Sequence, residues 1–290
     1  MFSAFNLTIT EDFFYDTAKD FEQYIELGKN HIRDGIKSYK MDLERFIKNK
    51  IINGSELQEN WFPEIEADIF ISHSHDDKDL ANALAGWLYD EFKLKVFIDS
   101  NVWGYTEQLL DEINNKYSKK RDNNGNWVYD RSTYNIVSQH VNIMLSAALQ
   151  KIIDKVECVI LLNTDNSVNI FQGGQMNTTY SPWIYSEILC TQIVRKKPLL
   201  SYRTYKMPIF ESTEAKGDVV DLLVSYNVSL DHLVDLEESY LMLWLEKYSQ
   251  KNLQYPLDAL YCSTHPDELN MTQNLFYDRT FATKLKKYIK

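Results

Sequence analysis

The sequence predicts an α/β fold in which a parallel sheet of five strands is flanked by helices. Residues 67–72 form a short β-branched and aromatic run, apolar residues recur at helical spacing from Leu80 to Phe92, and a second strand-like run follows at 94–99. A strand–helix–strand unit of this kind places its two strands parallel. A third run at 157–162 is again followed by a helical pattern. This alternation of strands and helices is typical of an α/β domain.

The composition is that of a folded protein with a sizeable core. Of the 290 residues, 44% are hydrophobic and 13% are aromatic, whereas Gly and Pro number only 9 and 6. A chain of this length holds one large domain, or one domain with substantial additions. The scarcity of Gly and Pro argues against long disordered linkers.

The net charge and the cysteine content indicate which classes of partner and which cellular compartment to expect. A net charge of −11 repels phosphate backbones, so nucleic acid is not an expected partner, whereas a phosphorylated small molecule responds to the local field. The three cysteines form no CxxC pair, and Cys158 and Cys190 lie in apolar runs, so both are expected in the core. Reduced thiols, no visible signal peptide and no apolar stretch of ~20 residues favour a cytoplasmic protein that does not span a membrane.

Residues 1–62 are expected to form a helical N-terminal extension. An apolar stripe over 11–51 predicts one long helix or two stacked helices, with a break near Gly28 and Gly35. The stripe consists of Phe14, Ala18, Phe21, Ile25, Gly28, Ile32, Ile36, Tyr39, Leu43 and Phe46. It has two interpretations, namely packing against the main domain or a self-association surface.

Residues 63–230 are expected to form the α/β domain, and 231–290 a mainly helical C-terminal extension packed on it. A polar insertion interrupts the domain at about 100–140. The apolar patterns further predict helices around 141–153, 183–195 and 232–248, a fourth strand at 197–202 and a fifth within 219–228.

Polar and aromatic residues follow each of the first three predicted strands. They are Ser72, His73, Ser74, His75, Asp76 and Asp77, then Asp99, Ser100, Asn101 and Trp103, then Asn163, Thr164, Asp165 and Asn166. The carboxyl ends of parallel strands meet at one edge, where open α/β sheets bind their ligands. Hydroxyls, amides, carboxylates and aromatic rings that converge there suit the ribose hydroxyls and flat bases of a nucleotide.

Trp183 and Glu187 add an aromatic ring and a carboxylate to that edge. They lie four positions apart in Ser181-Pro-Trp-Ile-Tyr-Ser-Glu187, so they share one face at the start of a helix. Taken alone, such a pair is more often a core Trp beside a solvated Glu.

The histidine-rich segment and the glycines favour simpler interpretations. His73 and His75 with Asp76 and Asp77 resemble metal ligands, but a third ligand is not evident, so a polar rim or a helix cap is preferred and no metal is predicted. Neither a GxGxxG nor a GxxxxGK[ST] pattern occurs, so the sequence contains neither the Rossmann dinucleotide-binding motif nor a P-loop.

Together these segments resemble a bacterial Toll/interleukin-1 receptor (TIR) domain over roughly 65–230. The matching stretches are Ala67-Asp-Ile-Phe-Ile-Ser-His-Ser-His75 with Asp76-Asp77, Val96-Phe-Ile-Asp99, Val159-Ile-Leu-Leu162 and Ser181-Pro-Trp-Ile-Tyr-Ser-Glu187. Phe97-Ile-Asp-Ser100 followed by Val102-Trp-Gly-Tyr105 is similar to a subgroup associated with anti-phage defence, including Thoeris-type signalling enzymes. The long segment 100–140 departs from the family pattern.

The resemblance implies a flavodoxin-like sheet and, as in enzymatic members, cleavage of the nicotinamide–ribose bond of NAD, which is a substrate and not a cofactor. The family's catalytic glutamate maps onto Glu187 and its motif tryptophan onto Trp183. The other expected pocket residues are Ser72, Ser74, Asp99, Asn101, Trp103 and His140. The resemblance also implies a homo-oligomer and a downstream effector that senses the product, whether ADP-ribose, a cyclic isomer or a conjugate.

Two rival interpretations remain at the level of sequence. A non-catalytic TIR scaffold would act through TIR–TIR contacts, although such domains often lack the glutamate that is present here as Glu187. An enzyme like a nucleoside deoxyribosyltransferase would share the layered fold and use a single carboxylate on deoxynucleosides. Release of nicotinamide from NAD discriminates among the three.

Overall fold

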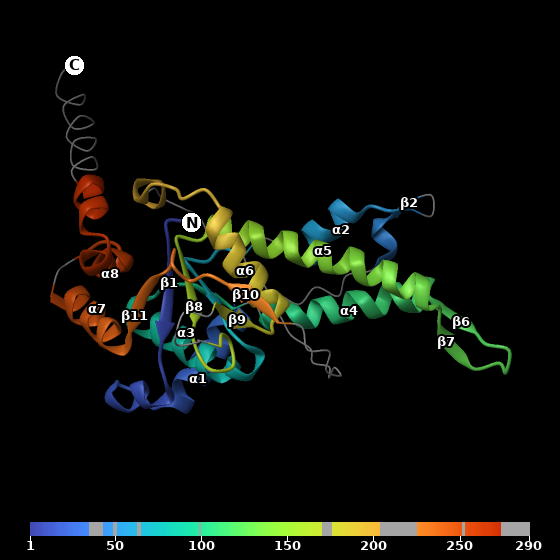
Figure 1. Cartoon of the computed structure of the whole chain (residues 1–290), viewed down its shortest axis with the longest axis horizontal. Coiled ribbons are helices and arrows are strands. Elements are labelled where there is room, and N and C mark those ends of the chain that lie inside the picture. The colour runs from blue at the N-terminus through green and yellow to red at the C-terminus, as the bar shows by residue number, and fades with distance from the viewer. Residues whose placement is uncertain are drawn as a thin grey trace, which may run out of the picture.

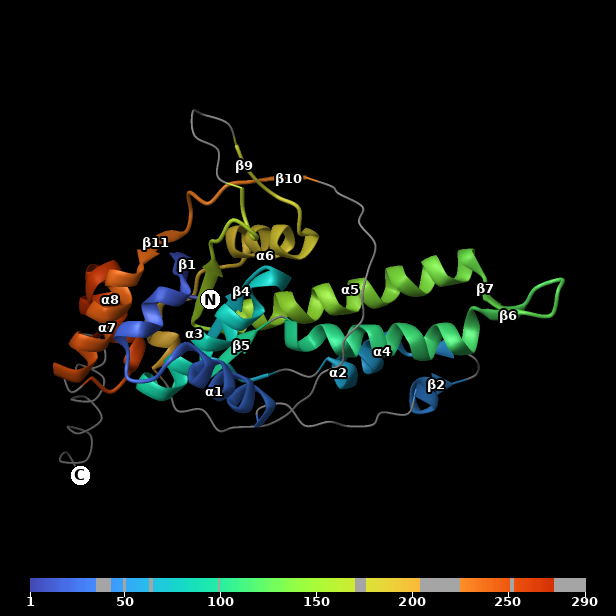
Figure 2. The same ribbon diagram turned by 90° about the horizontal axis from the view of Figure 1, so that it is seen from below.

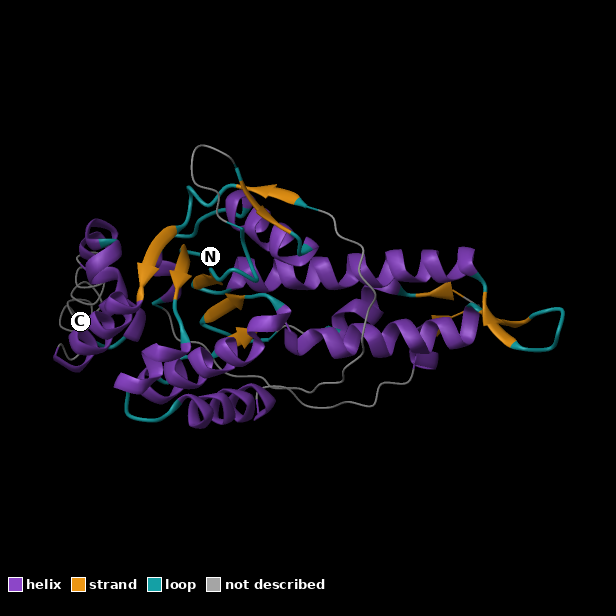
Figure 3. Cartoon of the chain, turned by 60° about the horizontal axis from the view of Figure 1, so that its bottom comes forward, coloured by secondary structure: helices purple, strands orange, loops and turns teal. Residues whose placement is uncertain are grey.

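A computed structural model describes residues 1–34, 43–48, 51–62, 65–98, 100–169, 176–203, 225–250 and 253–273, without the side chains of 101–105. Its centre is a parallel sheet of five strands between layers of helices (Figure 3). The strands are β1 (Ser3–Thr8), β4 (Ile69–Ser72), β5 (Val96–Ile98), β8 (Cys158–Leu162) and β11 (Val234–Glu237). Their order across the sheet is β11-β1-β8-β4-β5. The predicted α/β class and the five parallel strands are confirmed.

Three of the five predicted strands occupy the sheet, the fourth is not a strand, and the fifth segment contains a strand that lies outside the sheet. The segment predicted as the fourth strand contains a 3-10 helix, Leu199–Tyr202, after Pro198, which lacks the N–H that a central strand must donate. In the segment predicted as the fifth, β10 (Tyr226–Val228) pairs antiparallel with β9 (Asn177–Thr179), outside the sheet, and 219–224 lie outside the described residues. Their two places are taken by β1 and β11, so a strand from the predicted N-terminal extension lies inside the sheet.

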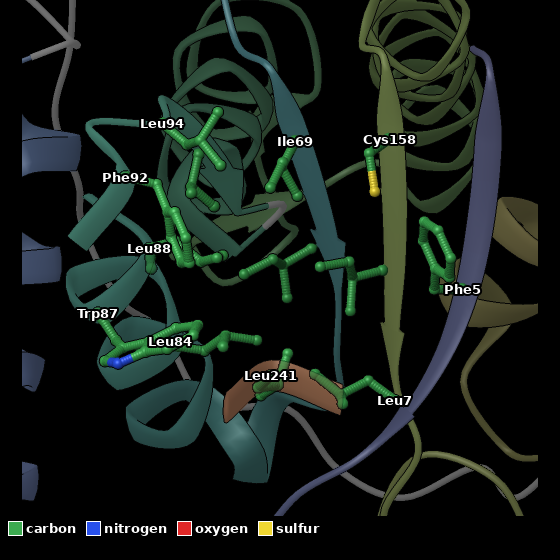
Figure 4. Close-up of a cluster of buried hydrophobic side chains, with 14 of the residues drawn as sticks. Phe5, Leu7, Ile69, Leu84, Trp87, Leu88, Phe92, Leu94, Cys158 and Leu241 are labelled. Carbon is green, nitrogen blue, oxygen red and sulfur yellow. The ribbon is translucent and has the colours of Figure 1, made fainter. Parts of the chain in front are cut away.

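Successive strand residues point to opposite faces, and each face has its own helices. The first face is covered by α1 (Phe21–Asp34), α3 (Lys78–Phe92), α7 (Glu238–Gln250) and α8 (Pro256–Thr264). Figure 4 shows this cluster, with Phe5, Leu7, Ile69 and Cys158 from the strands and Leu84, Trp87, Leu88, Phe92 and Leu241 from the helices. The second face, with Phe70, Phe97 and Leu161, is covered by α2 (Gly54–Trp61), α5 (Arg131–Lys155) and α6 (Pro182–Ile193).

Among the described residues, only part of the segment predicted as helix over 11–51 is α-helical. Its helical part is α1, which is preceded by a 3-10 helix at Glu11–Asp16 and followed, beyond the undescribed residues 35–42, by a 3-10 turn at Leu43–Phe46 and the strands β2 (Ile47–Lys48) and β3 (Ile51–Ile52). The apolar stripe of α1 packs against α3, as the first of the two interpretations expected. The crossing is close, because a Cβ on Gly28 or Gly86 would lie 2.0 Å from a backbone oxygen of the other helix.

The insertion at 100–140 forms an arm of two long helices. α4 (Ser100–Tyr117) and α5 run side by side away from the sheet, joined at the tip by the two-stranded ribbon of β6 (Lys119–Arg121) and β7 (Trp127–Tyr129) (Figures 1 and 2). Asp130 caps α5 by accepting a hydrogen bond from the Thr133 amide at 3.0 Å. The packing of the two helices buries Leu109, Ile113 and Val141.

The C-terminal segment is helical and is tied to the sheet by buried charges. The helix predicted at 232–248 begins later than expected, because β11 precedes α7. Arg203 donates two parallel hydrogen bonds to Glu157, which precedes β8, at 2.8 and 2.9 Å, and others to Asp258 on α8. Within the described part of the chain, no helix is both long and apolar enough to cross a bilayer.

Candidate functional site

The sheet has a topological switch point between β4 and β8. The chain leaves β4 through α3 for β5 on one side, and it leaves β8 through α6 for β11 beyond β1 on the other. The connections after these two neighbouring strands therefore lead to opposite sides of the sheet. In open α/β sheets, ligands bind at such a switch point, at the carboxyl ends of the strands.

Glu187 and Ser72 meet at this position. Ser72 ends β4, and its Oγ donates a 2.6 Å hydrogen bond to Oε2 of Glu187 on α6. Each residue is only 2% exposed. A hydroxyl-to-carboxylate bond of this length is in the range of charge-assisted hydrogen bonds, and a buried carboxylate needs such partners. Of the pocket residues expected from sequence, the structure brings these two into contact.

The local sequence places Glu187 at this depth. Ser181 is the N-cap of α6 and accepts a hydrogen bond from the Ile184 amide at 3.2 Å, and Pro182 follows in the first turn, where a missing N–H costs nothing. Ile184 and Ile188 are buried against the sheet. Glu187 lies on the same side as these apolar anchors, which carries its carboxylate toward the end of β4.

The surroundings of Glu187 are apolar on one side. Trp183, one turn earlier on α6, is half-buried and packs against the hydrophobic cluster of the second face. Cys190 is buried on the same helix, and burial, with a smaller contribution from the Glu187 carboxylate, raises the pKa of its thiol to about 11. Cys190 is therefore a neutral packing residue, as is buried Cys158; both match the prediction that they belong to the core.

The remaining predicted pocket residues are distributed differently. Ser74 is half-buried and directly precedes a 3-10 helix at His75–Asp77. Asp99 lies outside the described residues, and the side chains of Asn101 and Trp103, on α4, lie outside them too. His140 is exposed on α5 and lines a separate groove of about 620 Å³ with residues such as Ile51, Gln58 and Met144. The structure therefore does not place His140 with Ser72.

The histidines after β4 do not share a ligand geometry. His73 is buried and His75 is exposed. Among the described residues, no group of three or more His, Cys, Asp or Glu side chains is arranged to hold a metal ion.

Asp77 belongs to this edge, although the sequence did not mark it as a pocket residue. It is 8% exposed and accepts hydrogen bonds from Thr164 Oγ1 at 2.5 Å and Asn166 Nδ2 at 2.8 Å. These bonds join the loop after β4 to the loop after β8. The sequence signal was the run of polar residues after each strand, which indicates the edge but not its internal pairs.

Comparison with known proteins identifies no relative. No protein-family model matches the chain, and no curated protein and no solved structure is significantly similar to it.

Proposed function

We propose that the protein is a TIR-type enzyme that cleaves the nicotinamide–ribose bond of NAD with Glu187 as its catalytic carboxylate. The observation that carries the proposal is the burial of Glu187 against Ser72 beside the switch point of the sheet. The motif resemblance supports the same assignment. So does the order β5-β4-β8, because the first three strands of a flavodoxin-like sheet also run 2-1-3.

The chemistry matches what one carboxylate can do. When the C–N bond breaks, nicotinamide leaves with the bonding electron pair as a neutral base, so the leaving group needs no general acid. Positive charge develops on the ribose, as it does in glycoside hydrolysis. A fixed carboxylate next to that ribose stabilises the charge as it forms, and preorganised electrostatic contacts of this kind often contribute more to catalysis than any other effect.

Ser72 and Trp183, which lie near the carboxylate, have separate roles in this proposal. Ser72 holds one carboxylate oxygen and so fixes the orientation of the carboxylate, which lies beside the ribose in this proposal. The half-buried ring of Trp183 provides a flat surface for nicotinamide or adenine. The ribosyl cation is then captured by water, by the adenine or by another nucleophile, which yields ADP-ribose, a cyclic isomer or a conjugate.

The test is the release of nicotinamide from NAD by purified protein and by Glu187→Gln. We expect the substitution to lower the rate at least about 100-fold, the usual cost of one transition-state electrostatic contact. The amide oxygen still accepts the Ser72 hydrogen bond, so the unfolding midpoint should change little. Glu246→Gln, which removes an exposed carboxylate from α7, is the matched control and should retain full activity.

The outcomes separate the rival functions. An unchanged rate in Glu187→Gln would remove the site assignment. No turnover of NAD by the wild-type protein at any concentration would favour the TIR scaffold, and base exchange on deoxynucleosides without NAD cleavage would favour the deoxyribosyltransferase.

The wider role rests on the resemblance. In this proposal the protein is a cytoplasmic homo-oligomer whose product is a signal in anti-phage immunity, sensed by a downstream effector. Mass spectrometry of the small molecules formed from NAD identifies the product. Sedimentation of the active species tests the oligomer, and a strictly monomeric, fully active preparation would contradict it.

A further inference from the structure

Asp77 bridges the two loops that border the candidate site. Its carboxylate accepts from Thr164 through Oδ2 and from Asn166 through Oδ1, so both oxygens are engaged by the loop after β8. The backbone N–H of Asn166 also donates a hydrogen bond to Thr164 Oγ1 at 3.2 Å. The bridge therefore ties the loop after β4 to the loop after β8 at the carboxyl ends of the two strands.

A continuous series of hydrogen bonds leads from this bridge to α6. The Thr164 amide donates to Ser167 Oγ at 2.9 Å, and Thr179 Oγ1 donates to the Ser167 carbonyl at 2.8 Å. The Ser181 amide then donates to Thr179 Oγ1 at 3.2 Å, and Ser181 is the N-cap of α6. Ser167 and Thr179 are 2% and 0% exposed, so water cannot easily replace these bonds.

We infer that Asp77 is a positioning residue for Glu187. It fixes the loop after β8, and through Ser167, Thr179 and Ser181 that loop fixes the start of α6 and hence the depth at which Glu187 meets Ser72. The role of Asp77 is to hold Thr164 and Asn166 through two hydrogen bonds, not to supply a charge or a proton to the substrate. The kinetic part of this inference rests on the proposed NAD cleavage, whereas its structural part does not.

Three substitutions and one control test the role. Asp77→Ala removes both acceptors and Thr164→Val removes the hydroxyl. Asp77→Asn keeps both contacts, because its amide can donate to the Thr164 hydroxyl while its oxygen accepts from Asn166. Asp76→Ala alters the exposed neighbour and is the control.

The first readout is the kinetics of nicotinamide release, measured well below each variant's unfolding midpoint. We expect Asp77→Ala to lower kcat about 10- to 100-fold with little change in KM, since a displacement of about 1 Å in a catalytic group has effects of this size. Thr164→Val should act in the same direction, the double variant should be no slower than Asp77→Ala, and Asp77→Asn and Asp76→Ala should stay near wild type. An unchanged kcat in Asp77→Ala, or an Asp77→Asn variant as slow as Asp77→Ala, would overturn the inference.

The second readout is amide hydrogen exchange in the first turn of α6, at Ile184 and Tyr185, which needs no substrate. We expect exchange there to accelerate at least about tenfold in Asp77→Ala but not in Asp77→Asn or Asp76→Ala, because local opening is governed by such tertiary ties. If wild-type protein does not cleave NAD, the proposed function fails while this measurement still decides the positioning role. Unaltered exchange at Ile184 in Asp77→Ala would refute it.

Discussion

At the scale of single residues, the Ser72–Glu187 hydrogen bond joins a strand end to a helix across 115 positions of sequence. Ser72→Ala leaves a buried carboxylate oxygen without this donor. We expect the free energy of unfolding to fall by about 1.5–3 kcal/mol, the range for hydrogen bonds to charged groups. Urea unfolding measures it. Ser74→Ala, at the half-buried neighbour, should change stability by less than about 0.5 kcal/mol, and equal effects at the two serines would contradict the assignment.

His265 makes stability depend on pH where the C-terminal segment meets β1. Its ring lies among Phe2, Phe5 and Tyr261, and its Nε2 is 3.2 Å from Ser3 Oγ. Burial lowers the pKa of His265 below its ordinary 6.5. The unfolded chain then binds more protons than the native one below about pH 6.5, so this contribution to stability is lost as pH falls through the lowered value.

We therefore expect the urea midpoint to fall between pH 7 and pH 5, and to fall less steeply in His265→Gln, which keeps a partner for Ser3 but does not titrate. His232, whose pKa burial also lowers, contributes in the same direction. A wild-type slope in His265→Gln would contradict this account.

At the scale of elements, α1 and α3 depend on two glycines at their crossing. A Cβ on Gly86 would lie 2.0 Å from the Tyr24 carbonyl oxygen, and one on Gly28 would lie 2.0 Å from that of Asn82. Since backbone atoms cannot swing aside, Gly86→Ala must separate the helices. We expect a loss of about 1–3 kcal/mol or more in unfolding free energy, measured by urea unfolding.

Gly54→Ala is the matched control for this crossing. The added Cβ would meet only the flexible end of Met144, at 3.2 Å, at a helical position that favours Ala over Gly. We expect stability within about 1 kcal/mol of wild type. A Gly86→Ala protein as stable as Gly54→Ala would show that the helices do not cross this closely.

The elements also show what sequence patterns can and cannot predict. The strands at β4, β5 and β8 were predictable because each is a β-branched or apolar run beside a helical pattern. The strand β1 was missed because Ser3–Thr8 mixes polar and apolar residues, and its place beside β8 is set by tertiary contacts. The candidate site was likewise predictable only in part. The motifs predicted Glu187 and Ser72 as site residues. The contact between Asp77 and Thr164 was not predictable, because these residues are 87 positions apart and no local pattern encodes their contact.

At the scale of the whole molecule, β1 and the arm ribbon differ sharply in how they connect to the rest. β1 pairs with β8 on one side and β11 on the other, and Phe5 and Leu7 are fully buried. Among the described strands, β6 and β7 pair only with each other, and both are largely exposed. We therefore expect β1 to contribute strongly to the stability of the fold and the ribbon to contribute little.

Removal of residues 1–10 should therefore abolish cooperative folding, because it splits the sheet and exposes both neighbours of β1. Replacing residues 119–129 with a short Gly-Ser turn should leave the thermal midpoint nearly unchanged, since the Asp130 amide and the Ser118 carbonyl already lie 2.7 Å apart. Circular dichroism melting of both proteins measures the contrast. If the truncated chain retains a cooperative transition near the wild-type midpoint, β1 is not an integral strand, and the N-terminal segment is the appended extension that its sequence suggested.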